Sequence, residues 1–142
     1  PGIRAAALVP GFELKTTDAR RVLPRSFGFD DVVYNVGHAA FLVGAFVTGD
    51  FESLRFAMED RLHQPYRESL IPGMRQVFDA AMDAGALSVA ISGSGPTLIA
   101  FVSGSDAAIG EAMRSAWAKE GIESDVMLLE LDSQGHRVSM EE

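Results

Sequence analysis

Two apolar runs joined by a glycine-rich turn constrain the fold of this chain more than any other feature. Residues 86–92 and 97–103 both have β-forming composition, and Gly93-Ser94-Gly95-Pro96 lies between them. Apolar runs that flank a tight glycine loop are typical of a β-hairpin. The sequence therefore predicts an antiparallel pair of strands in the second half of the chain.

The order of the other elements follows from hydrophobic periodicity and turn residues. Residues 3–10, closed by Pro-Gly, predict the first strand, and residues 126–131 predict the last. Helical spacing recurs elsewhere, with expected helices at residues 17–23, 30–48, 51–58, 74–83 and 106–120, the last capped by Ser105 or Asp106.

This order of elements predicts the fold class. A strand, several helices, a hairpin, a helix and a final strand indicate an α+β fold: a ferredoxin-like sandwich whose mainly antiparallel four-stranded sheet carries helices on one face. We expect one domain over residues 1–142, with a polar tail at 132–142 that frays or extends.

The helix expected at 30–48 carries the widest apolar stripe. We expect it to be buried on most sides, capped by Asp30 and Asp31, with core hydrogen bonds from Asn35 and His38. Asn35 lining a site is the alternative. The apolar stretch 32–47 is too short to cross a bilayer comfortably, so we expect no membrane span. A domain with little mass to cover this helix favours dimerisation.

Composition excludes several function classes. A formal net charge of -8 argues against a nucleic-acid partner or an anionic membrane, because neutralising phosphates needs a basic face. The absence of cysteine excludes disulfides and thiol catalysis and suits a cytoplasmic location. His38, His63 and His136 lack ligand-like spacing, so we expect no metal site in this chain.

The turn of the hairpin is the sharpest chemical feature. Its two glycines, Gly93 and Gly95, let successive N–H groups turn toward one point and bind an anion. The hydroxyls of Ser92, Ser94 and Thr97 add donors. A plain hairpin turn remains the alternative. The segment is not a P-loop, because the lysine and the spacing of that motif are absent.

Residues 60–73 form a second polar cluster, interrupted by Pro65 and Pro72, which we interpret as a functional loop without long regular structure. Arg67 is a candidate fork for a carboxylate or phosphate, and its alternative is an ion pair with Glu68 or Asp60. For His63, a general base or phosphate donor is the sharper hypothesis, but we favour a structural donor.

The short helix at 17–23 carries adjacent arginines, Arg20 and Arg21, which point in different directions. One can therefore face a site while the other meets solvent. Elsewhere we expect Met74 and Met82 in the core, and Trp117 in the core or an interface.

Taken together, the segments resemble one family, the homoserine kinases of the GHMP superfamily. The glycine motif alone is shared by all GHMP kinases, whereas the other segments narrow the choice. The matching segments are Thr17-x-x-Arg20-x-x-Leu23-Pro24, Asp31-x-x-x-Asn35, Asp60-Arg61-Leu62-His63-Gln64-Pro65-Tyr66-Arg67, Leu70-Ile71-Pro72-Gly73, Ala84-Gly85-Ala86-Leu87 and Ser92-Gly93-Ser94-Gly95-Pro96-Thr97.

The resemblance implies ATP-dependent phosphorylation of the L-homoserine hydroxyl, with Mg²⁺ accompanying ATP. By motif position, Arg20 and Arg67 hold the substrate carboxylate, and the loop Ser92 to Thr97 lies beside the phosphates and the substrate. The family's nucleotide-binding loop lies in an N-terminal domain that these residues do not include, and the start of the chain suggests an internal cut. We therefore expect the chain to be inactive alone.

Two other functions stay open at this stage. One is a different GHMP kinase that acts on another small alcohol. The other is a stand-alone ferredoxin-like module that binds an amino acid through the same loop and arginines without chemistry. About 150 further residues upstream, roughly one more domain, would favour the kinase.

Overall fold

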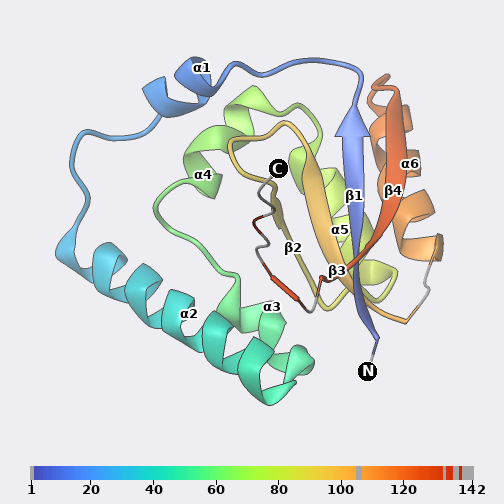
Figure 1. Cartoon of the computed structure of the whole chain (residues 1–142). Helices are drawn as coiled ribbons and strands as arrows, with labels where there is room; N and C mark the ends of the chain where they lie inside the picture. Colours follow the sequence, from blue (N-terminus) through green and yellow to red (C-terminus); the bar gives the residue numbers. More distant parts are fainter. Residues whose placement is uncertain (1, 105–106, 133, 136–137, 139–142) are drawn as a thin grey trace, which may run out of the picture.

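The computed structural model describes residues 2–104, 107–132, 134–135 and 138. Four strands form a single sheet in the order β2-β3-β1-β4, and every neighbouring pair is antiparallel (Figure 1). The fold class expected from the sequence, an α+β sandwich with this kind of sheet, is confirmed. The strands are β1 (Ile3–Pro10), β2 (Ser88–Ile91), β3 (Leu98–Ser103) and β4 (Ser124–Glu130).

The core lies between the sheet and two helices, α5 (Met74–Asp83) and α6 (Ala107–Lys119). Burial alternates along β3, where Leu98, Ala100 and Val102 face the core, and Ala6 and Leu8 of β1 belong to the same core cluster. Trp117 is fully buried, and its indole N–H donates to the carbonyl of Pro72 at 2.8 Å. Both amphipathic helices were predicted. The expected caps Ser105 and Asp106 lie outside the described residues.

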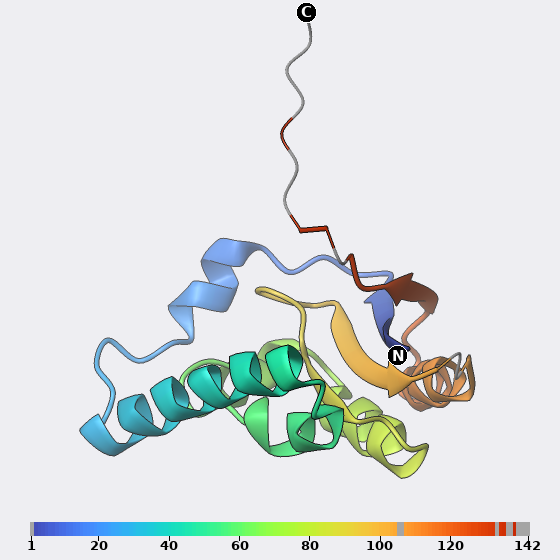
Figure 2. The same ribbon diagram turned by 60° about the horizontal axis from the view of Figure 1, so that its bottom comes forward.

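Helix α2 (Phe29–Thr48) corrects one expectation. It was expected to be buried on most sides, yet Ala45 is its only buried residue. In Figure 1 it lies on the opposite side of the molecule from α6, and Figure 2 agrees. Apart from edge-on contacts of Phe46 with Phe51 and Phe101, little of the described chain is available to cover it. Its large exposed residues are Phe29, Val32, Val33, Val36, Phe41, Val43 and Val47.

Two further details of α2 differ from the sequence-based expectation. Gly28 is the N-cap, so Asp30 and Asp31 lie in the first turn, where their charge suits the helix dipole without capping. At 20 residues, the helix has the length and apolar composition needed to cross a bilayer, although the stretch was expected to be too short. One helix that meets this criterion by length and composition alone is weak evidence, so it does not identify a membrane span.

Short helices occupy the connections. Helix α1 (Thr16–Arg21), expected at 17–23, starts after Lys15 without a side-chain cap. The expected helix at 51–58 is split into η1 (Phe51–Ser53) and α3 (Leu54–Ala57). Residues 60–73, expected as a loop, contain α4 (Gln64–Arg67) and η2 (Glu68–Leu70); the prolines keep these helices short. Most of the tail at 132–142 lies outside the described residues.

Candidate functional site

The turn between β2 and β3, residues 92–97, is called the anion loop below. The N–H of Ser92 donates to the carbonyl of Thr97 at 2.8 Å, and that of Gly95 donates to the carbonyl of Ser92 at 3.0 Å. Gly93 and Gly95 have φ of 61° and 82°, the left-handed region that favours glycine. Within the described chain, the N–H groups of Gly93 and Ser94 have no hydrogen-bond partner. They are therefore available to an anion.

Gly95 also fits closely against the core below the loop. A Cβ added there would lie 2.8 Å from Cδ1 of Ile71 and 3.2 Å from Cγ2 of Ile91. Ile71 is almost fully buried. The absence of a side chain at Gly95 therefore lets the loop rest on the core at a fixed height.

Arg67 joins the anion loop to α1. Its Nη1 donates to the carbonyl of Gly93 at 2.8 Å, and its Nε donates to the carbonyl of Ala19 at 3.3 Å. The alternative ion pairs with Glu68 and Asp60 are not formed, because Glu68 instead accepts two bonds from Arg75, at 2.9 and 2.6 Å. Nη2 of Arg67 has no hydrogen-bond partner among the described residues, so its N–H donors are available.

Arg20 lies beside this junction, since it follows Ala19 in the chain. Its side chain is exposed and makes no hydrogen bond or ion pair with the described residues. Arg21, by contrast, pairs with Asp18 at 2.9 Å in solvent. The hydroxyls of Thr16 and Ser94 lie 3.3 Å apart and hold α1 against the anion loop. The structure thus brings Arg67 and the loop into contact, and the backbone of Ala19, the residue before Arg20, lies at the same junction.

His63 lies between Asp60 and Arg67. Its Nε2 is 3.6 Å from a carboxylate oxygen of Asp60, and its Nδ1 is 3.4 Å from Nη1 of Arg67. Burial lowers the pKa of His63 and nearby Arg67 lowers it further, although Asp60 opposes both. A neutral ring can accept a hydrogen bond from Arg67 at Nδ1, whereas the sequence favoured a structural donor, and the role of His63 stays a prediction.

Asn35 does not reach the anion loop. Its Nδ2 donates to Oδ1 of Asp60 at 2.7 Å, and its Oδ1 accepts the N–H of Arg61 at 2.8 Å. These bonds tie α2 to the segment before α4. His38 also hydrogen-bonds, because its Nδ1 lies 2.8 Å from the carbonyl of Tyr34. The sequence predicted core hydrogen bonds for Asn35 and His38, but the bonds they make are part-buried or exposed, because α2 buries only Ala45.

Asp60 is a residue whose role sequence reasoning missed. Its side chain is 6% exposed. It accepts the N–H groups of Leu62, His63 and Gln64, at 3.3, 2.8 and 2.6 Å. Burial raises the pKa of Asp60, but the bonds from Gln64, His63 and Asn35 outweigh it, so the pKa is lowered. An aspartate four residues before a Gln-Pro helix start was the available signal.

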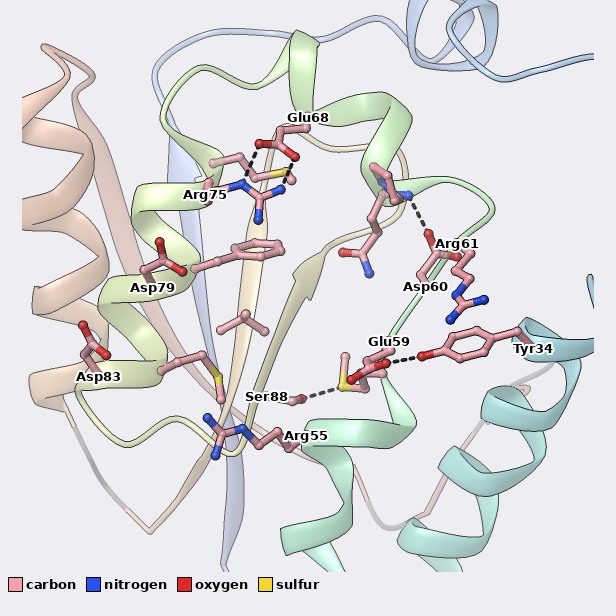
Figure 3. A pocket seen from close by; sticks show the side chains of 17 residues that line it. Tyr34, Arg55, Glu59, Asp60, Arg61, Glu68, Arg75, Asp79, Asp83 and Ser88 are labelled. Carbon is pink, nitrogen blue, oxygen red and sulfur yellow. Dashed lines mark hydrogen bonds and ion pairs between the residues drawn. The ribbon is translucent and has the colours of Figure 1, made fainter. Parts of the chain in front are cut away.

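A separate cavity of about 860 Å³ lies between α3, α4 and α5 (Figure 3). Neither candidate arginine nor any residue of the anion loop lines it. Several of its charges are already paired: Glu68 binds Arg75, Glu59 accepts a hydrogen bond from the Tyr34 hydroxyl, and the Arg61 guanidinium stacks over the Tyr34 ring at 3.6 Å. Sequence reasoning did not find this cavity, because distant helices build it.

No metal-binding group is found in the part of the chain that the structure describes. Among those residues, no cluster of three or more His, Cys, Asp or Glu side chains gathers around one point. His136 lies outside the described residues.

Residues 42–121 match the family model described as GHMP kinases C terminal. The match covers more than half of the chain. This chain belongs to the GHMP kinase C-terminal family.

Curated relatives of this chain include several homoserine kinases. The chain is 48% identical to the homoserine kinase of Halothermothrix orenii over 133 residues, which is 94% of this chain and 43% of that protein. It is 47% identical to the homoserine kinase of Microchaete diplosiphon, over 89% of this chain and 42% of that protein. The chain thus spans less than half the length of these curated relatives.

A solved structure agrees with this GHMP kinase assignment. The crystal structure of homoserine kinase from Cytophaga hutchinsonii superposes with a TM-score of 0.89 at 36% sequence identity. The match covers 94% of this chain and 43% of that one. The described domain is therefore similar to one part of a larger kinase.

Proposed function

We propose that this chain is the substrate-side part of a homoserine kinase, which transfers the γ-phosphoryl group of ATP to the hydroxyl of L-homoserine. The observation that carries the proposal is Arg67, which spans the carbonyls of Ala19 and Gly93. That bridge supports a role for Arg20 as well, because Arg20 follows Ala19 in the chain and the bridge links Ala19 to a loop with free N–H groups. Cations beside an anion loop suit a substrate that carries a carboxylate and receives a phosphoryl group.

Each part of the candidate site has a different task in this reaction. Arg20 and the free Nη2 of Arg67 bind the substrate carboxylate. The N–H groups of Gly93 and Ser94, with the hydroxyls of Ser92, Ser94 and Thr97, face phosphate oxygens. Positioning and charge stabilisation of this kind dominate catalysis of phosphoryl transfer. His63 and Asn35 support the site and do not touch substrate.

ATP and Mg²⁺ bind mainly through residues outside this chain. ATP supplies the phosphoryl group, and Mg²⁺ neutralises charge on its phosphates. The described residues offer no cluster of metal ligands. The proposal therefore assigns nucleotide and metal binding to an N-terminal domain, consistent with a chain that spans 43% of its Halothermothrix orenii relative. Because half of the site does little on its own, the isolated chain is inactive.

The proposed assembly is a cytoplasmic homodimer in which α2 lies in the dimer interface. The apolar face of α2, including Val36 and Val43 at 65% and 64% exposure, motivates this. Sedimentation of the full-length enzyme tests whether it is a dimer. A strictly monomeric profile would contradict the proposal.

The main test compares Arg20→Ala and Arg67→Ala with wild type in the full-length enzyme, measuring homoserine-dependent ADP release. Losing a charged carboxylate contact should raise KM for homoserine by about 10- to 100-fold. Arg21→Ala is the matched control, because Arg21 already pairs with Asp18, and its KM should stay near wild type.

Other outcomes would redirect the assignment. Normal kinetics in both arginine variants would keep the kinase and reject these substrate contacts. Turnover of another small alcohol in place of homoserine would indicate a different GHMP kinase. No turnover of any alcohol would favour a ferredoxin-like module that binds an amino acid.

A further inference from the structure

The anion loop is held in place largely by side chains from outside it. Within the loop there are two backbone hydrogen bonds, from Ser92 to Thr97 and from Gly95 to Ser92. Neither bond involves the N–H of Ile91 or the carbonyl of Gly93, which flank Ser92 on the first arm of the loop. Its orientation therefore depends on what binds the backbone near residues 91 and 93.

The N–H of Ile91 lies on the open edge of the sheet. Strand β2 is an edge strand, and it pairs with β3 alone. Because the N–H of Ser92 points toward Thr97, the N–H of the preceding residue points the other way. No strand lies there to accept it.

The side chain of Gln64 accepts that hydrogen bond. Its Oε1 lies 2.7 Å from the Ile91 nitrogen, in a part-buried position. The glutamine amide thus takes the place of a neighbouring strand at the last residue before the anion loop. A part-buried N–H of Ile91 without an acceptor would cost free energy. The hydrogen bond to Gln64 therefore stabilises this end of β2.

Gln64 and Arg67 act on the same loop arm from one helical turn. They are three residues apart in α4, so their side chains lie on the same face of the helix. Gln64 binds the N–H of Ile91, and Arg67 binds the carbonyl of Gly93. Two contacts two residues apart therefore hold this arm of the loop from the side of α4, in addition to the packing of Gly95 on the core.

Helix α4 depends on Asp60 for its own position. A helix of four residues is not stable alone. The carboxylate of Asp60 accepts the N–H groups of His63 and Gln64, and Asn35 donates to it from α2. The support therefore runs from α2 through Asp60 to α4, and from Gln64 to the loop.

We propose that Gln64 is a positioning residue for phosphoryl transfer, which aligns the anion loop through the N–H of Ile91 without touching substrate. The inference rests on the proposed kinase function. It predicts that losing the acceptor lowers kcat while binding of the homoserine carboxylate, assigned to the arginines, is retained.

The test uses the full-length enzyme with Gln64→Met, which keeps the length of the side chain and removes the acceptor. We expect kcat to fall by about tenfold or more, because small misplacements of catalytic groups are costly. KM for homoserine should change by less than about twofold. Amide hydrogen exchange in the peptide covering residues 88–98 should become faster.

Three further variants complete the design. Gln64→Glu keeps an acceptor oxygen and should restore most of the wild-type kcat and exchange. Gln64→Asn is one methylene shorter and cannot reach Ile91, so it should repeat the loss and serves if Gln64→Met folds poorly. Gln76→Met is the matched control, because Gln76 is exposed on α5, and it should behave as wild type.

If kcat is unchanged in Gln64→Met and Gln64→Asn, the proposal is wrong, whatever the rate of amide hydrogen exchange. It is also wrong if Gln64→Glu loses as much kcat as Gln64→Met. A wild-type enzyme without homoserine kinase activity would instead reject the proposed function. In that case, faster exchange at residues 88–98 would still support positioning of the loop by Gln64, and unchanged exchange would overturn it.

Discussion

Helices α2 and α6 carry the same kind of apolar repeat but are buried to very different extents. Helix α6 buries Ile109, Gly110, Met113, Ala116 and Trp117 against the sheet and α5. Helix α2 is longer and more uniformly apolar, yet it buries Ala45 alone. The comparison teaches that periodicity identifies an apolar face, whereas burial depends on whether the chain supplies a partner for that face.

The largest expected effect on stability comes from comparing one buried side chain of α6 with one exposed side chain of α2. Trp117→Ala removes a fully buried ring and should lower the free energy of unfolding of this chain by about 3–5 kcal/mol. Val36→Ala, on the exposed face of α2, should change it by less than about 0.5 kcal/mol at concentrations where the chain is monomeric, because the proposed dimer interface then contributes nothing. Urea unfolding followed by circular dichroism measures both. A loss above about 2 kcal/mol in Val36→Ala would contradict the exposure of α2.

The second comparison uses one glycine from each helix. A Cβ at Gly110 of α6 would lie 2.5 Å from Cγ1 of Val126 on β4, so Gly110→Ala should destabilise the chain by about 1–3 kcal/mol. Gly44 of α2 has no heavy atom within 4 Å of an added Cβ. Gly44→Ala should therefore stabilise the chain by up to about 1 kcal/mol through helix propensity. Thermal unfolding of the two variants measures this difference between α6 and α2. Equal shifts in unfolding temperature would contradict the expected difference.

The smallest effect concerns the polar contact that anchors α2 through Asn35 to Asp60. The pKa of Asp60 is lowered in the folded chain, so its carboxylate contributes stability above the ordinary pKa, 3.8. That contribution is lost as the pH falls through the lowered folded value. Asp60→Asn should therefore be less stable than wild type near pH 7, and the difference should shrink below about pH 4.

Urea unfolding of wild type and Asp60→Asn at the two pH values checks this linkage. The difference between the two proteins cancels the titration of other carboxyl groups, including Glu68, whose pKa Arg75 also lowers. A difference that stays constant with pH would show that Asp60 does not stabilise the fold through its charge.

Sequence reasoning predicted the fold well because its main signals are local. The glycine turn, the strand at β1 and the apolar spacing of α5 and α6 each depend on neighbouring residues, and all of them agree with the structure. The exposure of α2 could not be predicted, because it depends on what lies across the helix.

The candidate site was predictable as a set of residues but not as a set of contacts. Arg67 contacts the anion loop and the residue before Arg20, and the role of both arginines in binding substrate stays a prediction. What the sequence could not supply was the partner of each group. Arg67 binds two backbone carbonyls, and Gln64 binds a backbone N–H 27 residues away. Contacts between a side chain and a distant backbone group produce no periodic pattern in the sequence, so they cannot be predicted from it.

The position of Trp117 gives this protein a built-in optical probe. It is the chain's single tryptophan, so all indole fluorescence comes from one buried place. Because its N–H is bound to the carbonyl of Pro72, just before α5 begins, the emission reports on the packing of α5, α6 and the sheet. The same signal should be nearly silent when α2 acquires or loses a partner, so association and unfolding can be followed separately in one sample.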